Sequence, residues 1–175
     1  MKKILIVVDM QNDFIDGSLG TPEAVAIVDN VVDKIISFDG EIIVTQDTHF
    51  DNYLQSAEGR KLPVEHCIKD THGWQVNDKI VKALSESDNI HYVEKLTFGS
   101  VDLPGLIKEI VVDDDFSIEL VGLCTDICVV SNALLLKANY PEKSISVDSS
   151  CCAGVTPESH KMAINTMTMC QIEIK

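Results

Sequence analysis

Three residues in this sequence have side chains that could together perform covalent hydrolysis. Asp9, Lys95 and Cys128 each come just after a short apolar run that predicts a buried strand. A thiol near the start of a helix and beside an ammonium group can have its pKa lowered, which makes it a nucleophile. A neighbouring carboxylate can take the thiol proton and later return it to a leaving group. We therefore predict a nucleophilic Cys128, with Lys95 as its cation and Asp9 as its general base.

A second group of reactive side chains lies in the segment 46–75, which is too long to be a simple connector. Asp47 and His49 form an Asp-x-His pair, and Glu58 and His66 follow in the same segment. Carboxylate and imidazole ligands suit a divalent ion, with zinc as the first choice and manganese or iron as alternatives. Cys67 is excluded because neighbours in an extended segment point in opposite directions. Spacing alone leaves open the alternative that these are ordinary polar loop residues.

Strand and helix patterns alternate along the chain, and these elements must position the reactive residues. The helix expected from Pro22 has Thr21 as its N-cap and Pro22 in its first turn. Alternating elements with strands that are apolar on both faces predict an α/β fold, in which helices cover a parallel sheet on both sides and ligands bind at the carboxyl ends of the strands. The apolar face of the first long helix is expected to comprise Val25, Val28, Val32, Ile35 and Ile36. Strands are expected at 4–8, 41–45, 91–94, 117–122, 144–147 and 171–175, and helices at 22–38, 76–84, 103–111, 127–138 and 157–169.

Length and composition narrow the class of protein. At 175 residues the chain is expected to form a single domain, 1–175. A net charge of −14 argues against nucleic acid and anionic membranes as partners. No apolar run is long enough for a membrane span or a signal peptide, so we expect a cytoplasmic protein whose six cysteines are reduced thiols.

Taken in order, the motifs resemble those of the isochorismatase-like cysteine hydrolases, in the nicotinamidase/pyrazinamidase branch. The resemblance implies a Rossmann-like, three-layer α/β/α sandwich around a six-stranded parallel sheet. It implies that Asp9, Lys95 and Cys128 form the catalytic triad. It also implies a cis peptide bond between Leu123 and Cys124, which would turn the Cys124 N–H toward the oxyanion, beside that of Cys128. The motifs that carry the resemblance are Val8–Phe14, Thr45–His49, Pro63–Cys67, Glu94–Phe98, Gly122–Val129 and Asp148–Thr156.

The same resemblance implies that Asp47, His49 and His66 bind the metal, which would hold the pyridine nitrogen of the substrate. Two departures from the family pattern concern this pocket. Many nicotinamidases have a further His shortly after Asp-x-His; this chain has none, and Glu58 is expected to replace it. Many members also have a Trp just before the His-Cys pair, and here that stretch is Leu-Pro-Val-Glu. Phe14 is then expected to contact the substrate ring, with Trp74 as a more distant candidate.

The expected activity is hydrolysis of a small amide, first of all nicotinamide to nicotinate and ammonia, through a thioester on Cys128. The family also suggests a homo-oligomer and a place in NAD salvage. Alternatives are an isochorismatase-type reaction on a vinyl ether, another small amide, or a metal-binding or thiol redox module that would use Cys151 and Cys152. A phospho-acceptor receiver domain and a dinucleotide oxidoreductase are disfavoured, because Cys128 replaces a Ser/Thr switch and a GxGxxG loop is missing.

Overall fold

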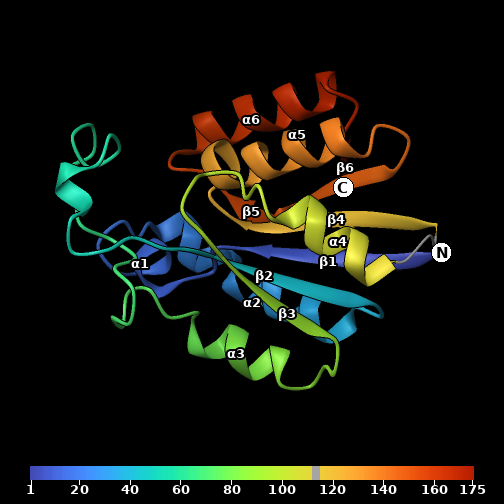
Figure 1. Cartoon of the computed structure of the whole chain (residues 1–175), viewed down its shortest axis with the longest axis horizontal. Helices are drawn as coiled ribbons and strands as arrows, with labels where there is room; N and C mark the ends of the chain where they lie inside the picture. The colour runs from blue at the N-terminus through green and yellow to red at the C-terminus, as the bar shows by residue number, and fades with distance from the viewer. Residues whose placement is uncertain (112–114) are drawn as a thin grey trace.

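Six strands form one parallel sheet in the computed structural model, which describes residues 1–111 and 115–175 (Figure 1). The sheet follows the predicted strands closely, except that the fifth strand continues for six residues beyond its expected end at Val147. The strands are β1 (Lys2–Val8), β2 (Glu41–Asp47), β3 (Ile90–Lys95), β4 (Phe116–Leu123), β5 (Ser144–Ala153) and β6 (Glu173–Ile174).

Helices cover both faces of the sheet and bury two separate hydrophobic cores. Leu5 and Val7 of β1 join the core beneath α2 and α3, whereas Ile4 and Ile6 point into the core beneath α4, α5 and α6. This alternation follows from the two-residue period of a strand. The predicted three-layer α/β/α sandwich is therefore confirmed (Figure 1). The helices are α1 (Asn12–Ile15), α2 (Pro22–Ser37), α3 (Asp78–Leu84), α4 (Leu103–Val111), α5 (Val130–Asn139) and α6 (Pro157–Met169), with the short turns η1 (Tyr53–Gln55) and η2 (Thr125–Val129).

The strand order is β3-β2-β1-β4-β5-β6, so the direction of winding reverses between β1 and β4. In open parallel sheets, ligands bind outside the carboxyl ends of the strands at such a reversal. Gly122 allows the two central strands to approach closely there. Its φ is +115°, and a Cβ at this position would lie 2.1 Å from the carbonyl oxygen of Val8. The fold thus directs the segments after β1 and β4 toward one place.

Helix α2 begins as predicted, with the Thr21 hydroxyl accepting a hydrogen bond from the Ala24 N–H. Its buried face differs from the predicted one, because Val25 and Ile36 are half exposed. Apolar residues cover so much of this helix that its periodicity fits two overlapping faces, and contact with the sheet selects one of them. The buried residues are Ala24, Ile27, Val28, Val31 and Ile35.

All six cysteines are free thiols, as predicted. Five of them are buried or partly buried, and Cys170 is exposed. Among residues 1–111 and 115–175, no helix combines the length and the apolar character needed to cross a membrane.

Candidate active site

Asp9, Lys95 and Cys128 meet at the carboxyl edge of the sheet, as the sequence predicts. Lys95 is the last residue of β3, and its Nζ lies 2.7 Å from Asp9 Oδ2 and 3.5 Å from Cys128 Sγ. The side chains of Lys95 and Asp9 are fully inaccessible to solvent. A buried ammonium between a carboxylate and a thiol can stabilise negative charge on either partner. The arrangement can therefore support proton transfer between Cys128 and Asp9.

The backbone conformation of Asp9 and a hydrogen bond from Thr45 fix the position of its carboxylate. Its backbone has a left-handed φ of 47°, which is uncommon outside glycine and turns the chain sharply after β1. The hydroxyl of Thr45, on the neighbouring strand β2, donates a hydrogen bond of 2.6 Å to Asp9 Oδ1. Burial raises the pKa of Asp9, and the nearby Asp47 adds to this effect, whereas Lys95 and Thr45 oppose it. A carboxyl group with a raised pKa is better suited to accept and return a proton near neutral pH.

The pKa of Cys128 is raised well above its usual range, which corrects the lowered value expected from the sequence. Burial is the main cause, because only 4% of the residue is exposed. The charge of Asp9 and its hydrogen bond with the thiol add to the effect, and Lys95 opposes it. The raised pKa favours a resting thiol over a free thiolate. The thiol proton has to pass to Asp9 as the sulfur attacks.

The turn that carries Cys128 starts two residues earlier than predicted. It is a single π-helical turn, η2, which leads directly into α5. The N–H groups of Ile127 and Val129 both donate to the carbonyl of Cys124, at 3.1 and 3.0 Å. The peptide bond between Leu123 and Cys124 is cis, as the family resemblance implied. Isolated π-turns inside helices are frequent at functional sites.

Asn132 holds this turn in place through side-chain hydrogen bonds, and the sequence pattern did not indicate this role. Its buried side-chain amide donates to the carbonyls of Cys128, at 2.8 Å, and Phe98, at 3.2 Å, while its oxygen accepts the N–H of Ser100 at 2.8 Å. Asn132 therefore connects the nucleophile to the loop after β3. The available signal was an amide side chain four residues after Cys128, one helical turn further along.

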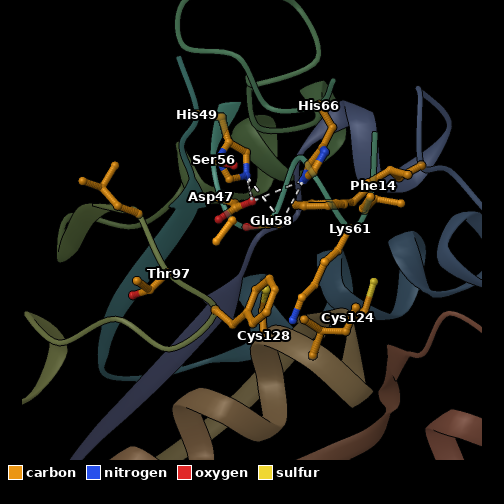
Figure 2. A pocket seen from close by; sticks show the side chains of 16 residues that line it. Phe14, Asp47, His49, Ser56, Glu58, Lys61, His66, Thr97, Cys124 and Cys128 are labelled. Carbon is orange, nitrogen blue, oxygen red and sulfur yellow. Dashed lines mark ion pairs between the residues drawn. The ribbon is translucent and has the colours of Figure 1, made fainter. Parts of the chain in front are cut away.

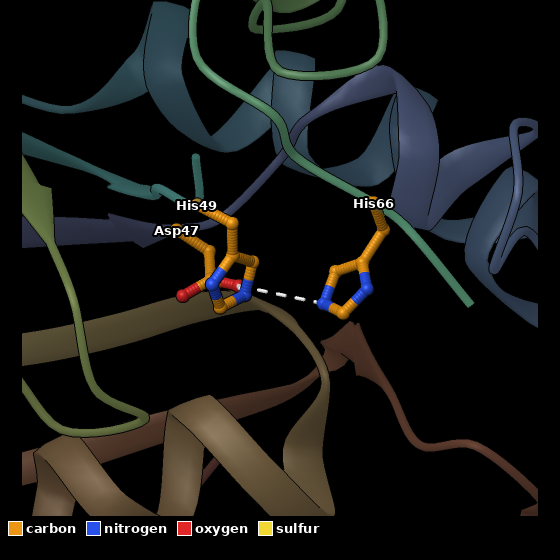
Figure 3. Close-up of side chains that lie close together, drawn as sticks. All are labelled: Asp47, His49 and His66. Atoms are coloured by element: carbon orange, nitrogen blue, oxygen red, sulfur yellow. Dashed lines mark ion pairs between the residues drawn. The ribbon is translucent and has the colours of Figure 1, made fainter. Parts of the chain in front are cut away.

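Asp47, His49 and His66 form a second cluster next to the triad (Figure 3). One ligand atom from each lies within 4.8 Å of the other two. His49 Nε2 is 3.1 Å from Asp47 Oδ2, and His66 Nε2 is 3.7 Å from the same oxygen. Glu58 Oε1 approaches both rings, at 3.7 Å from His49 Nε2 and 3.6 Å from His66 Nε2. The structure therefore brings all four predicted ligands together.

The donor atoms of this cluster fit a divalent ion. His66 Nδ1 lies 2.8 Å from the carbonyl of Val64, an acceptor that places the proton on Nδ1 and leaves the Nε2 lone pair facing Asp47. His49 Nε2 is buried and faces two carboxylate oxygens, Asp47 Oδ2 at 3.1 Å and Glu58 Oε1 at 3.7 Å. Imidazole nitrogens and carboxylate oxygens that converge in this way are ligand types that divalent ions take. Cys67 packs in the hydrophobic core beneath α2 and not with these ligands, although its left-handed φ of 46° differs from the extended backbone expected there.

Asp47 connects the two clusters. Its Oδ1 lies 3.0 Å from Lys95 Nζ, while its Oδ2 faces the imidazoles. Although burial acts to raise it, the pKa of Asp47 is lowered by the hydrogen bond from His49 and by the charge of Lys95. Asp47 is therefore a carboxylate that can bind a cation on one side and Lys95 on the other.

Gln11 positions Asp47 and was also missed in the sequence. Its fully buried amide donates to the Asp47 carbonyl at 2.8 Å and accepts the Asp47 N–H at 2.7 Å. The same Nε2 atom donates to the carbonyl of Trp74 at 2.8 Å. Gln11 thus joins the end of β2 to the segment after His66. Its position in the motif directly after β1 was the one sequence feature that could have indicated this role.

A pocket of about 570 Å³ opens above both clusters (Figure 2). Phe14 lines it, as predicted, next to His66, with 5.5 Å between the two ring centres. Trp74 does not line it, because its indole N–H donates to the Thr48 hydroxyl at 2.9 Å. Lys61 also lines the pocket, and nothing in the sequence pattern indicated this.

Comparison with known proteins identifies the family and supports the fold. Residues 3–174 match the isochorismatase domain. An isochorismatase family protein named PncA, from Bacillus subtilis, is 28% identical over 94% of this chain and 93% of its own length. The crystal structure of nicotinamidase/pyrazinamidase PncA from the same organism superposes with a TM-score of 0.84 at 26% identity, covering 99% of each chain. The pyrazinamidase of Pyrococcus horikoshii, solved in complex with zinc, has a TM-score of 0.83 at 24% identity, with 100% and 99% covered, and so supports the fold.

Proposed function

This chain is a hydrolase of the isochorismatase family, and we propose that it is a cysteine-dependent amidohydrolase that converts nicotinamide and water to nicotinate and ammonia. The observation that carries the proposal is the position of Lys95. Its ammonium contacts both Asp9 and Cys128 at the base of a pocket large enough for a small ring. The solved relative named nicotinamidase/pyrazinamidase supports this choice of substrate.

In the proposed reaction, Cys128 Sγ attacks the amide carbon while its proton moves to Asp9. The N–H groups of Cys124 and Cys128 would stabilise the oxyanion of the tetrahedral intermediate. Asp9 then gives the proton to the leaving nitrogen, the C–N bond breaks, and ammonia departs from a thioester. Asp9 next takes a proton from water, which attacks the thioester, and the thiol regains a proton as the acid leaves. Lys95 stabilises Asp9 and the developing thiolate throughout.

Asp47, His49 and His66, with Glu58 beside them, would hold a divalent ion, with zinc as the first choice and manganese or iron as alternatives. When bound, the ion would supply a Lewis acid for the ring nitrogen of the substrate. Because Asp9, Lys95 and Cys128 can act without it, removal of the ion should raise KM more than it lowers kcat. Metal analysis of the wild type beside His49→Ala and Glu58→Ala tests the ligand set. Undiminished metal content in Glu58→Ala would remove Glu58 from it.

Ammonia release from nicotinamide tests the function directly, with Cys128→Ala as the inactive control. Isochorismate is the comparison substrate, because its vinyl-ether chemistry needs no cysteine nucleophile. Turnover of nicotinamide that depends on Cys128 would support the proposal. Hydrolysis of isochorismate alone, or nicotinamide turnover retained in Cys128→Ala, would overturn it.

A further inference from the structure

Lys61 introduces a positive charge into a pocket that combines the metal-ligand cluster on one side with apolar side chains on the other. Its side chain extends from the 56–62 loop across the pocket, toward the turn that carries Cys124 and Cys128 (Figure 2). Leu19, Leu96 and Phe98 line the same cavity. A cation beside apolar walls is a feature of ligand pockets in which one charged group selects the substrate.

The ammonium of Lys61 has no anionic partner among the described residues, unlike the lysine that contacts Asp9 and Cys128. Lys95 is buried and already paired with Asp9 and Asp47. Lys61 is exposed to solvent and forms no ion pair, and the carboxylate nearest to it in sequence, Glu58, faces the imidazoles instead. Lys61 is therefore available to a group on the ligand.

The backbone under Lys61 is fixed, so that the side chain enters the pocket from a defined point. The N–H groups of Lys61 and Leu62 both donate to the Glu58 carbonyl at 2.8 Å. The Tyr53 hydroxyl donates to the Leu62 carbonyl at 2.9 Å, and the N–H of Gly59 donates to the Ser56 hydroxyl at 2.9 Å. These bonds close the loop on itself. An ordered backbone lowers the entropy lost when the lysine binds a ligand.

We propose that Lys61 forms an anion subsite, so that the pocket prefers small amides that carry a carboxylate over neutral amides of the same size. The preference rests on the proposed amidohydrolase activity, because the carboxamide must still reach Cys128. The carboxylate would bind Lys61 through a charge-assisted hydrogen bond in a pocket that the ligand itself shields from water. Nicotinamide would remain a substrate, bound without this contact.

Succinamate and butanamide test the inference, because they present the same amide on chains of similar length and differ in one carboxylate. We expect kcat/KM to favour succinamate by about tenfold, and Lys61→Met to abolish most of that preference. Lys69→Met is the matched control, since Lys69 lies nearby in sequence but pairs with Glu94 outside the pocket. An equal rate for the two amides in the wild type, or an unchanged ratio in Lys61→Met, would overturn the subsite.

A binding measurement tests the anion subsite independently of the proposed reaction. Succinamate is titrated calorimetrically into Cys128→Ala and into Cys128→Ala with Lys61→Met, at low and high salt. We expect Kd to rise about tenfold in the double variant at low salt, and the difference to shrink at high salt. That result would support the subsite even if no amide were hydrolysed. Equal Kd values would refute it, even if nicotinamide were a good substrate.

Discussion

Replacing Thr45 by valine keeps the shape of the side chain but removes its hydroxyl, which donates to the side chain of the proposed general base and accepts a weaker hydrogen bond of 3.3 Å from the Asp9 N–H. Thr45 is fully buried on β2, and its hydroxyl donates to Asp9 Oδ1 at 2.6 Å. Lys95 remains on Asp9 Oδ2, and the Asp9 N–H keeps its bond to the Thr45 carbonyl at 3.2 Å. The variant therefore leaves one oxygen of a buried carboxylate without its donor.

The size of the effect follows from the charge on the acceptor. A hydrogen bond to a charged group contributes roughly 1.5–3 kcal/mol, and one pH unit corresponds to about 1.4 kcal/mol. Asp9 must be ionised to take the thiol proton, so activity is lost as pH falls through its folded-state pKa. Burial already raises that pKa, and losing the Thr45 donor raises it further. The acid limb of kcat/KM should therefore move to higher pH by about one unit or more.

The free energy of unfolding of Thr45→Val should also depend on pH, because the same pKa shift acts on it. When a carboxyl group has a higher pKa in the folded state than in the unfolded state, the protein loses stability as the pH rises from the unfolded-state pKa to the folded-state pKa. Thr45→Val extends this loss to higher pH. The difference in unfolding free energy between wild type and variant should therefore be small below the acid limb and reach roughly 1.5–3 kcal/mol above it.

Two measurements check this reasoning, namely the pH profile of kcat/KM and denaturant unfolding on either side of the limb. Ser100→Ala is the control, because Ser100 Oγ is also buried near the site but has no hydrogen-bond partner among the described residues. It should leave the limb in place. A variant Thr45→Val that loses activity with an unmoved acid limb would show that Thr45 does not act through the charge of Asp9.

Further predictions concern the nucleophile and Gln11, which positions the metal ligand Asp47. Cys128→Ala should lower ammonia release about 10⁴-fold or more and leave the melting temperature within a few degrees, whereas Cys124→Ala should keep most activity because only its N–H is used. Comparable losses in both variants would mean that the wrong thiol was chosen. Gln11→Leu removes both hydrogen bonds to the Asp47 backbone and should weaken metal binding about 10–100-fold, measured by competition with a chelator. Unchanged metal affinity would contradict this positioning role.

The sequence by itself singled out the candidate residues that the structure brings together. Asp9, Lys95 and Cys128 could be found because each follows a strand pattern, and parallel strands bring their carboxyl ends to one edge. Asp47 and His66 could be found because metal ligands are of few chemical types and lie in a loop too long for a connector. These inferences need only local periodicity and side-chain chemistry, which the sequence contains directly.

The tertiary structure decided how those residues are charged and what else joins them. The raised pKa of Cys128 depends on its burial and on the distance to Asp9, neither of which is a local property. Asn132 and Lys61 joined the site only once separate segments had packed together, because helix and loop patterns do not say which residue faces a cavity. The order of the strands, with the reversal between β1 and β4, likewise comes from long-range pairing, since each strand's own pattern is compatible with several neighbours.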